Sequence, residues 1–79
     1  MTAHRDTVFS QRLRALMKEE DMKASELAMH IYMSHSTIKS YVTGRHEPIV
    51  ETLVLMCKLF NVTADYLIGL TDERTPLKE

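Results

Sequence analysis

The sequence has few of the residues that build disulfide-bonded, β-rich or membrane-spanning proteins. A single cysteine, Cys57, cannot form an internal disulfide, and two glycines and two prolines are too few for the many turns of a β-sandwich. The longest apolar run, residues 53–57, is far shorter than the roughly 20 residues that cross a bilayer. The first residues also lack the apolar stretch of a secretory signal. These absences predict a protein of the reducing cytoplasm with no membrane span.

Net positive charge, which most nucleic-acid-binding proteins carry, is also missing, because the formal net charge is −1. The charges are unevenly distributed, however. Residues 22–46 contain a single acid, Glu26, whereas residues 51–79 are net acidic. The cations of the first segment are Lys23, Lys39 and Arg45. Any affinity for nucleic acid must therefore come from this local basic segment, and we expect the non-specific affinity to be modest.

With 79 residues, the chain has room for one domain and one core but not for a separate catalytic or effector domain. We therefore expect residues 1–79 to form a single domain. Leucine, methionine and alanine recur at helical spacing, which predicts an all-α fold class. The tail, residues 71–79, has mixed charge, a proline and no periodicity, and we expect it to be frayed.

The apolar periodicity predicts five helices, at about 7–20, 23–31, 34–43, 48–60 and 63–68, with Pro48 at the entry to the fourth. Ser34 and Thr63 are good N-caps, and Gly44 and Gly69 follow the third and fifth helices, where a left-handed residue ends a helix. Lys23, at the cap of the second helix, has no acceptor for the free N–H groups, so that helix start should be weaker by roughly 1 kcal/mol. The fourth helix is apolar nearly all round. The apolar residues that recur at intervals of three and four along it are Val50, Leu53, Val54, Cys57 and Phe60.

Only Tyr32 and Met33 separate the second helix from the Ser34 cap of the third. Two helices joined by so short a turn must cross steeply, which predicts a helix-turn-helix over about residues 24–43. The outward residues of the third helix are all polar. They are His35, Ser36, Lys39, Ser40 and Thr43. Such a face suits the edges of bases in the major groove, which combine donors, acceptors and the thymine methyl group.

The stretch from about residue 8 to residue 70 resembles the phage repressor and Cro-like, or lambda-repressor-like, family of helix-turn-helix transcriptional regulators. The specific part is the run SELAMHIYMSHSTIKSYVTGRHEPIVETL. It is similar to the family pattern of Glu-Leu-Ala, a turn four residues later, serine at the next cap, an internal Thr-Ile, glycine and then proline. The resemblance implies a compact five-helix domain that binds double-stranded DNA.

The resemblance also implies roles for individual residues. The positions that read bases are His35, Ser36, Lys39 and Ser40. The positions that contact phosphates are Ala24 and Ser25 at the start of the second helix, and Thr43, Arg45 and His46 after the third.

Three departures from the family pattern bear on this interpretation. Ala24 stands where a phosphate-binding glutamine is frequent, so only its backbone N–H can serve there. Tyr32 replaces the usual turn glycine, and a positive φ at that residue would carry strain of order 1 kcal/mol. Met17 and Val42 replace a buried arginine–glutamate pair between the first and third helices, and an apolar pair of this kind avoids a desolvation penalty.

A second surface is predicted by an excess of apolar residues on the fourth and fifth helices, because a domain this small cannot bury all of them. They are Leu55, Leu59, Tyr66, Ile68 and Leu70. A homodimer is the simplest explanation, and its two-fold axis would present two half-sites about 34 Å apart.

Two other kinds of site have weaker signals. His30, His35, His46 and Cys57 have no recognised metal-ligand spacing, and Cys57 suits a core position. The acids at residues 19–21 have no nucleophile or cleft motif beside them. We therefore predict neither an enzyme nor a metal, cofactor or small-molecule substrate.

The sequence thus predicts a dimeric transcriptional regulator that binds double-stranded DNA, most simply a repressor acting by operator occupancy. A rival hypothesis is a protein-interaction module, such as an antitoxin or anti-regulator, that sequesters a protein partner through its fourth and fifth helices. The near-neutral net charge and the missing phosphate anchor at Ala24 favour this rival.

Overall fold

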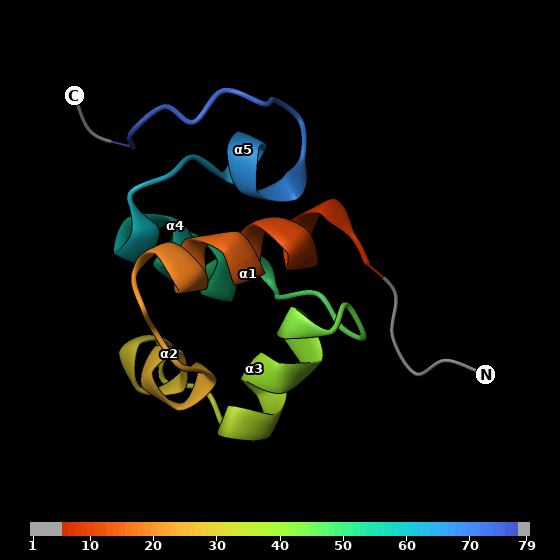
Figure 1. Cartoon of the computed structure of the whole chain (residues 1–79), viewed down its shortest axis with the longest axis vertical. Helices are drawn as coiled ribbons and strands as arrows, with labels where there is room; N and C mark the ends of the chain where they lie inside the picture. Colours follow the sequence, from red (N-terminus) through yellow and green to blue (C-terminus); the bar gives the residue numbers. More distant parts are fainter. Residues whose placement is uncertain (1–5, 78–79) are drawn as a thin grey trace.

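A computed structural model describes residues 6–77 and folds them into five helices, with no strand among those residues (Figure 1). The helices are α1 (Val8–Glu19), α2 (Ala24–Ile31), α3 (His35–Val42), α4 (Val50–Phe60) and α5 (Ala64–Ile68). The predicted all-α fold class and the predicted helix positions are confirmed. None of these helices has the length and apolar character needed to cross a bilayer.

Side-chain caps define the starts of three helices. The hydroxyl of Thr7 accepts from the N–H of Ser10 at 3.0 Å, and the N–H of Thr7 donates to the Ser10 hydroxyl at 3.0 Å, so α1 begins with a reciprocal capping box. Ser34 caps α3 by accepting from the N–H of Thr37 at 3.1 Å, and Thr63 caps α5 in the same way. These hydrogen bonds span three residues, which is why the helix starts can be predicted locally.

The start of α2 has only half of such a box. The side chain of Lys23 makes no capping hydrogen bond, whereas the carboxylate of Glu26 accepts from the N–H of Lys23 at 2.8 Å. One of the free donors at this helix end is therefore satisfied, and the weak cap expected at Lys23 is observed.

A residue with positive φ follows each of the five helices, and after α1 it is Asp21 (φ 52°). Gly44 (φ 81°) follows α3 and Gly69 (φ 93°) ends α5, as their positions predict. Tyr32 (φ 61°) ends α2 and Asn61 (φ 56°) ends α4. The helices thus end where a residue adopts the left-handed conformation. Tyr32 is the residue whose type suits that conformation least.

The core is a single apolar cluster to which all five helices contribute. Its buried members are Phe9, Leu13, Leu16, Met17, Leu27, Ala28, Ile31, Ile38, Tyr41, Met56, Cys57, Phe60, Val62 and Leu67. The rings of Phe9 and Tyr41 pack edge to face with their centroids 6.3 Å apart, which joins α1 to α3. The core therefore holds α3 from its inner side and leaves the polar side outward.

The inward face of α4 differs from the three-four pattern seen in the sequence. Val50 and Val54 are 74% and 43% exposed, whereas Thr52 and Met56 are buried. Because α4 is apolar nearly all round, its composition hides which side packs, and a threonine gives no apolar signal. Contact with α2 on one side and α5 on the other selects the face.

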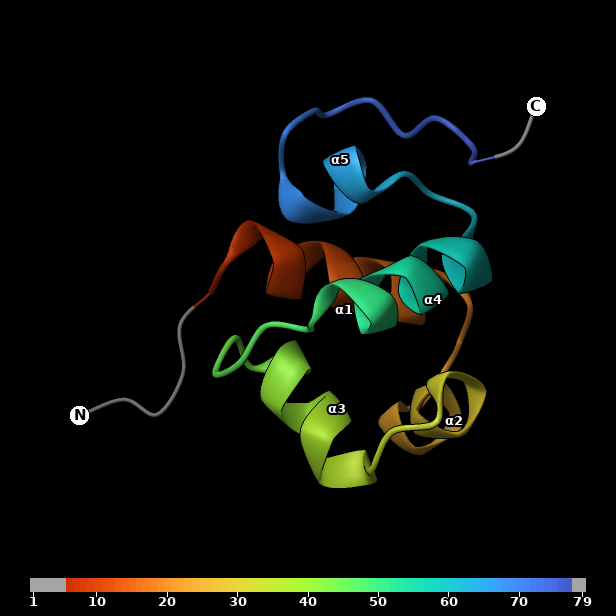
Figure 2. The same cartoon turned by 180° about the vertical axis from the view of Figure 1, so that it is seen from behind.

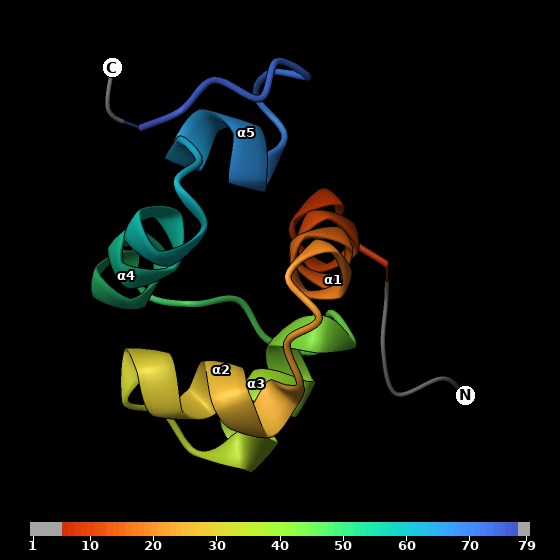
Figure 3. The same ribbon diagram turned by 60° about the vertical axis from the view of Figure 1, so that its left-hand side comes forward.

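The helices are stacked along the long axis of the molecule. α2 and α3 form one end, α5 forms the other, and α1 and α4 lie side by side between them (Figures 1 and 3). The view from behind in Figure 2 shows the same order. The helix-turn-helix is therefore an end of the molecule whose outer side no other helix covers.

Residues 71–77 of the tail that is predicted to be frayed lie over α5 and are tied to α1 by side chains, and residues 78 and 79 lie outside the described residues. We call residues 71–77 the C-terminal strap. The guanidinium of Arg12 donates to the carbonyl of Thr71 at 2.6 Å and to the carboxylate of Asp72 at 2.7 Å. The same group lies over the ring of Tyr66, 4.3 Å from its centroid. Arg12 thus fixes the first part of the strap to α1 and α5.

Two further contacts fix the rest of the strap. Arg74 makes a two-pronged pair with the carboxylate of Glu19, with N–O distances of 2.7 and 2.5 Å. The N–H of Leu77 donates to the side-chain oxygen of Asn61 at 3.1 Å. The strap therefore runs over α5 from its end back to the α4–α5 turn, as Figures 1 and 2 show. The bonded residues are 16 to 60 positions apart in the sequence, so local sequence patterns do not predict this arrangement.

Candidate nucleic-acid interface

The turn between α2 and α3 is tight. Tyr32 has φ 61° and ψ 42°, and the N–H of Met33 donates to the carbonyl of Ala28 at 2.9 Å, which closes the end of α2. The tyrosine side chain is 84% exposed, so burial of its ring contributes little to offset the strain of its backbone. The turn keeps the left-handed conformation that a glycine would adopt more easily.

The first part of the outward face of α3 is open to solvent. His35, Ser36 and Lys39 are exposed, and nothing in residues 6–77 covers them. Their side chains offer an imidazole, a hydroxyl and an ammonium within two turns of helix. This mixture can donate to and accept from the edges of bases.

Ser40 and Thr43, later on the same helix face, are half-buried and already bonded. The hydroxyl of Ser40 donates to the carbonyl of Thr37 at 2.6 Å, and that of Thr43 donates to the carbonyl of Ser40 at 3.2 Å. Each of these hydroxyl oxygens can still accept a hydrogen bond, but its proton is already donated within the protein. These two predicted DNA contacts are therefore more restricted than His35 and Lys39, while the exposed hydroxyl of Ser36 lies 3.3 Å from that of Ser34.

The start of α2 presents backbone donors. Ala24 is half-buried and Ser25 is exposed, and they occupy the first two helical positions, where N–H groups have no acceptor within the helix. Such an end attracts anions. Lys23 is exposed directly before them and adds a formal charge that the sequence-based list of contacts left out. Its place at the cap position was the signal that could have identified it.

The loop after α3 carries the other predicted phosphate contacts. Arg45 and His46 are exposed, and their N–H groups donate to the carbonyl of Ser40 at 2.9 and 3.3 Å, which ties the loop to α3. With Thr7, Gly44 and Glu47, these residues line a shallow hollow of about 390 Å³. Glu47 is an exposed acid in the same loop and reduces its positive potential.

The residues predicted to form a dimer surface fall into two groups. Leu55, Leu59 and Tyr66 are half-buried against the core, whereas Ile68 and Leu70 are 45% and 73% exposed. The other large exposed apolar residues near the start of α1 and on α4 were not predicted. They are Val8, Ile49, Val50 and Val54.

An apolar groove accompanies these exposed residues. It has a volume of about 380 Å³ and is lined by Thr7, Val8, Phe9, Glu47, Pro48, Leu53 and Ile68. The exposed apolar surface therefore centres on the starts of α1 and α4 and the end of α5, rather than on the C-terminal half of α4.

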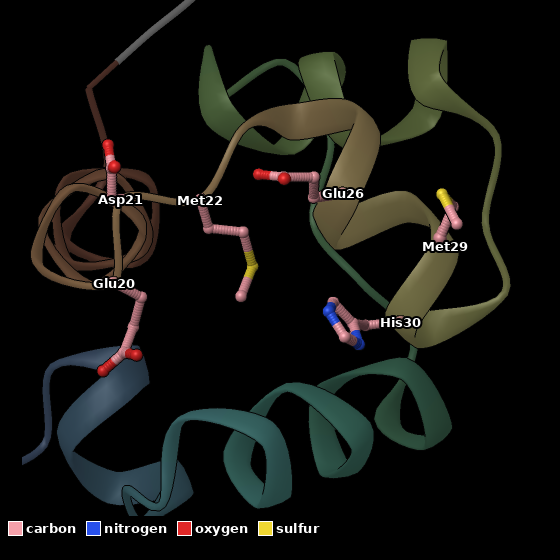
Figure 4. A pocket seen from close by; sticks show the side chains of 6 residues that line it. All are labelled: Glu20, Asp21, Met22, Glu26, Met29 and His30. Carbon is pink, nitrogen blue, oxygen red and sulfur yellow. The ribbon is translucent and has the colours of Figure 1, made fainter.

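A separate hollow of about 470 Å³ lies between the end of α1 and α2 (Figure 4). Met22 and His30 point into it, and Met29 also lines it. Glu26 is engaged with the N–H of Lys23. Across residues 6–77, no three acidic, histidine or cysteine side chains come together as metal ligands do, so we assign no chemistry to this hollow.

Cys57 is a buried core residue, as the sequence indicates. Burial in apolar surroundings raises the pKa of its thiol, which disfavours the reactive thiolate.

Comparison with known proteins places these features in a family. The Helix-turn-helix family matches residues 13–67. The uncharacterised HTH-type transcriptional regulator YobD of Bacillus subtilis (strain 168) is 33% identical over 91% of this chain and 64% of its own length. The HTH-type transcriptional activator BcrR of Enterococcus faecalis is 30% identical over 77% of this chain and 30% of its own length. The chain thus spans less than two thirds of these relatives.

Two solved structures share the fold. A transcriptional regulator from Listeria innocua superposes with a TM-score of 0.76, at 26% identity, over 91% of this chain and 64% of that one. The P22 c2 repressor, solved in complex with a synthetic operator, superposes with a TM-score of 0.75, at 23% identity, over 82% of this chain and 97% of that one. The expected lambda-repressor-like fold is confirmed by these likenesses.

Proposed function

This chain belongs to the Helix-turn-helix family, and from that premise we propose that it is a transcriptional regulator that binds double-stranded DNA sequence-specifically. Its simplest mode of action is repression by occupancy of an operator. The observation that carries the proposal is the outward face of α3, which is polar and open to solvent while its inner face is anchored in the core. The P22 c2 repressor, which has this fold, was solved with an operator.

In the proposed complex, α3 lies in the major groove. His35, Ser36 and Lys39 reach base edges directly, because their side chains are exposed at the first two turns. Ser40 contributes as an acceptor, since its hydroxyl proton is committed to the carbonyl of Thr37. Lys39 suits guanine, which offers two acceptors in the major groove.

Phosphate contacts flank this helix. The free N–H groups of Ala24 and Ser25 bind one phosphate at the positive end of α2. Thr43, Arg45 and His46 contact the backbone from the loop at the other end of α3. Lys23 supplies a charge near the α2 site, which offsets the absence of a side-chain donor at Ala24.

A homodimer is the proposed working form. Ile68 and Leu70 are exposed, and Ile68 lines the apolar groove together with Val8, so a second copy would remove this surface from water. Leu55, Leu59 and Tyr66 are half-buried and would lie at the margin. A two-fold dimer would match a palindromic operator with half-sites about 34 Å apart.

The proposed regulator needs no cofactor or small-molecule substrate, catalyses no reaction and acts in the cytoplasm. Members of its family act by binding, and the polar groups of the α2–α3 end suit a nucleic acid rather than a small ligand.

Selection of bound sequences from a random pool of duplex DNA tests the proposal. The wild-type protein should enrich one motif, and Ser36→Ala or Lys39→Ala should weaken binding to it by roughly 1–3 kcal/mol if each side chain makes a good base contact. Lys58→Ala, an exposed lysine on α4, is the matched control and should leave the affinity unchanged. No enriched motif, or unchanged affinity in both α3 variants, would refute the proposal.

A second candidate is a protein-interaction module such as an antitoxin or anti-regulator. The apolar groove with Val8 and Leu53, beside the exposed Ile49 and Val50, favours it, as does the near-neutral charge. Purification from the native host distinguishes the two, because a stoichiometric protein partner supports this candidate and bound DNA supports the regulator.

A further inference from the structure

The C-terminal end of α3 has an unusual cap. The last four carbonyls of a helix lack partners within the helix. In α3, the loop that follows provides N–H donors for the carbonyls of residues 39, 40 and 41, at 3.0, 2.9 and 3.2 Å. The carbonyl of Val42 instead accepts a hydrogen bond from a side chain of another helix. The donor is Nη1 of Arg14 on α1, at 2.7 Å.

Arg14 is itself fixed. Its Nη2 donates to the carboxylate of Asp6 at 3.0 Å, so the planar guanidinium is held between a carboxylate and a helix end. The C-terminal end of a helix carries partial negative charge, which favours a cation there. The hydrogen bond to the carbonyl is charge-assisted and directional, unlike a contact with a point charge.

This contact stands where the family resemblance implies a different one. The side chains of Met17 and Val42 replace an arginine and a glutamate, and both belong to the apolar packing, with Met17 in the core and Val42 half-buried against it. Arg14 lies three residues before Met17, on a neighbouring part of the same helix face. The polar link between α1 and the end of α3 is thus made by another α1 residue to the backbone of Val42.

We propose that Arg14 is a positioning residue that caps α3 and sets the orientation of the loop at residues 43–46. The carbonyl of Val42 and the N–H of Thr43 lie in one peptide plane, so holding that carbonyl fixes the plane from which the loop starts. The loop carries Thr43, Arg45 and His46, which are the proposed phosphate contacts. The consequence for DNA rests on the proposed function, whereas the cap itself does not.

Three variants test this role. Arg14→Met removes the donor and keeps a long side chain, Arg14→Lys keeps a cationic donor, and Asp6→Asn removes the carboxylate partner alone. The first readout is amide hydrogen exchange of the free protein. In Arg14→Met, the N–H groups of residues 44–46 should exchange roughly tenfold faster, while those of α2 keep their wild-type rates. Arg14→Lys should restore most of the protection, and Asp6→Asn, which leaves the donor in place but removes the carboxylate that holds it, should cause a smaller loss than Arg14→Met.

The second readout is binding to two duplexes of equal length, one selected by the wild type from a random pool and one unrelated. Arg14→Met should weaken binding to both by a similar factor of roughly ten, because the loop contacts the backbone and not the bases. Arg14→Lys should recover most of that loss.

The outcomes are distinguishable. Unchanged loop exchange in Arg14→Met would overturn the proposal, and weaker DNA binding with unchanged exchange would mean that Arg14 contacts phosphate itself. Faster exchange throughout α2 and α3 would also overturn it, because the residue would then stabilise the whole fold. A wild type that binds neither duplex would refute the proposed function, while the exchange rates would still decide whether Arg14 caps α3.

Discussion

Three residues other than glycine hold a positive φ in residues 6–77, and they differ in how well they tolerate it. Asp21 and Asn61 are of the short, polar residue types that adopt the left-handed region more readily than bulky residues do. Tyr32 is not of these types, and its ring is largely exposed. The turn of the helix-turn-helix therefore stores strain at a single residue.

Tyr32→Gly should raise the free energy of unfolding by about 0.5–1 kcal/mol, because relief of left-handed strain exceeds the entropy that glycine loses on folding. Asp21→Gly is the matched control and should gain less, since aspartate already tolerates this conformation. Urea denaturation monitored by circular dichroism measures both. Equal gains at the two positions would show that tyrosine adds no strain of its own to the turn.

At the scale of elements, the short helix α5 depends on what lies around it. Five residues are too few to form a stable helix alone. Its end approaches the start of α1 so closely that a Cβ atom on Gly69 would lie 2.8 Å from Cγ1 of Val8. Gly69 therefore serves two needs, a left-handed cap and a close approach between helices.

Gly69→Ala should destabilise the fold by about 1–2 kcal/mol through backbone strain, with a further loss from the displaced Val8. Adding Val8→Ala should recover the steric part only. Thermal unfolding of both single variants and the double variant separates the two. Strict additivity of the single-variant effects would rule out the contact with Val8 as a cause.

The strap is another element whose anchoring is electrostatic. The hydrogen bond from Arg74 lowers the pKa of the Glu19 carboxyl below its ordinary value of 4.5. A carboxyl whose pKa is lower in the folded state than in the unfolded state stabilises the fold when the pH is above its unfolded-state pKa. That stabilisation is lost as the pH falls through its folded-state pKa. The strap should therefore stay on α1 at neutral pH and loosen in acid below pH 4.5.

An NMR titration of the Glu19 carboxyl carbon tests this. The wild-type midpoint should lie below that of Arg74→Gln, in which the arginine partner is missing, and signals of residues 71–77 should shift with the same midpoint. Identical Glu19 midpoints in the two proteins would show that the pair does not persist in solution.

At the scale of the whole molecule, the net charge is nearly zero, so attraction to DNA depends on the cations of the α2–α3 end. Lys23, Lys39 and Arg45 belong to the α2–α3 end and its loop. At the opposite end, α5 and the strap carry the exposed acids Asp65, Asp72 and Glu73. DNA should therefore be bound in one orientation, with a salt dependence set by few cations.

If those three cations each neutralise one phosphate, the logarithm of the binding constant should fall with the logarithm of salt concentration with a slope of about −3 per protomer. Arg45→Ala should bring the slope to about −2 and weaken binding to all sequences alike. Fluorescence anisotropy with a labelled duplex at several salt concentrations measures both. A loss confined to one sequence would mean that Arg45 reads a base.

The amino-acid sequence by itself determined the five helices, their caps and the two-residue turn, because these depend on hydrogen bonds and periodicities that span a few residues. It also indicated the polar face of α3, since the inward positions Ile38 and Tyr41 set the phase of a short amphipathic helix.

Only the tertiary structure decided which sides of the remaining elements are covered. Burial of Thr52 and exposure of Val50 follow from where α2 and α5 pack on α4, which a helix apolar nearly all round does not reveal. The docked strap brings together Arg12 and Asp72, which are 60 positions apart in the sequence. The cap on α3 brings together Arg14 and Val42, which are 28 positions apart. Such pairs meet because the core brings their helices together, and no local pattern encodes that meeting.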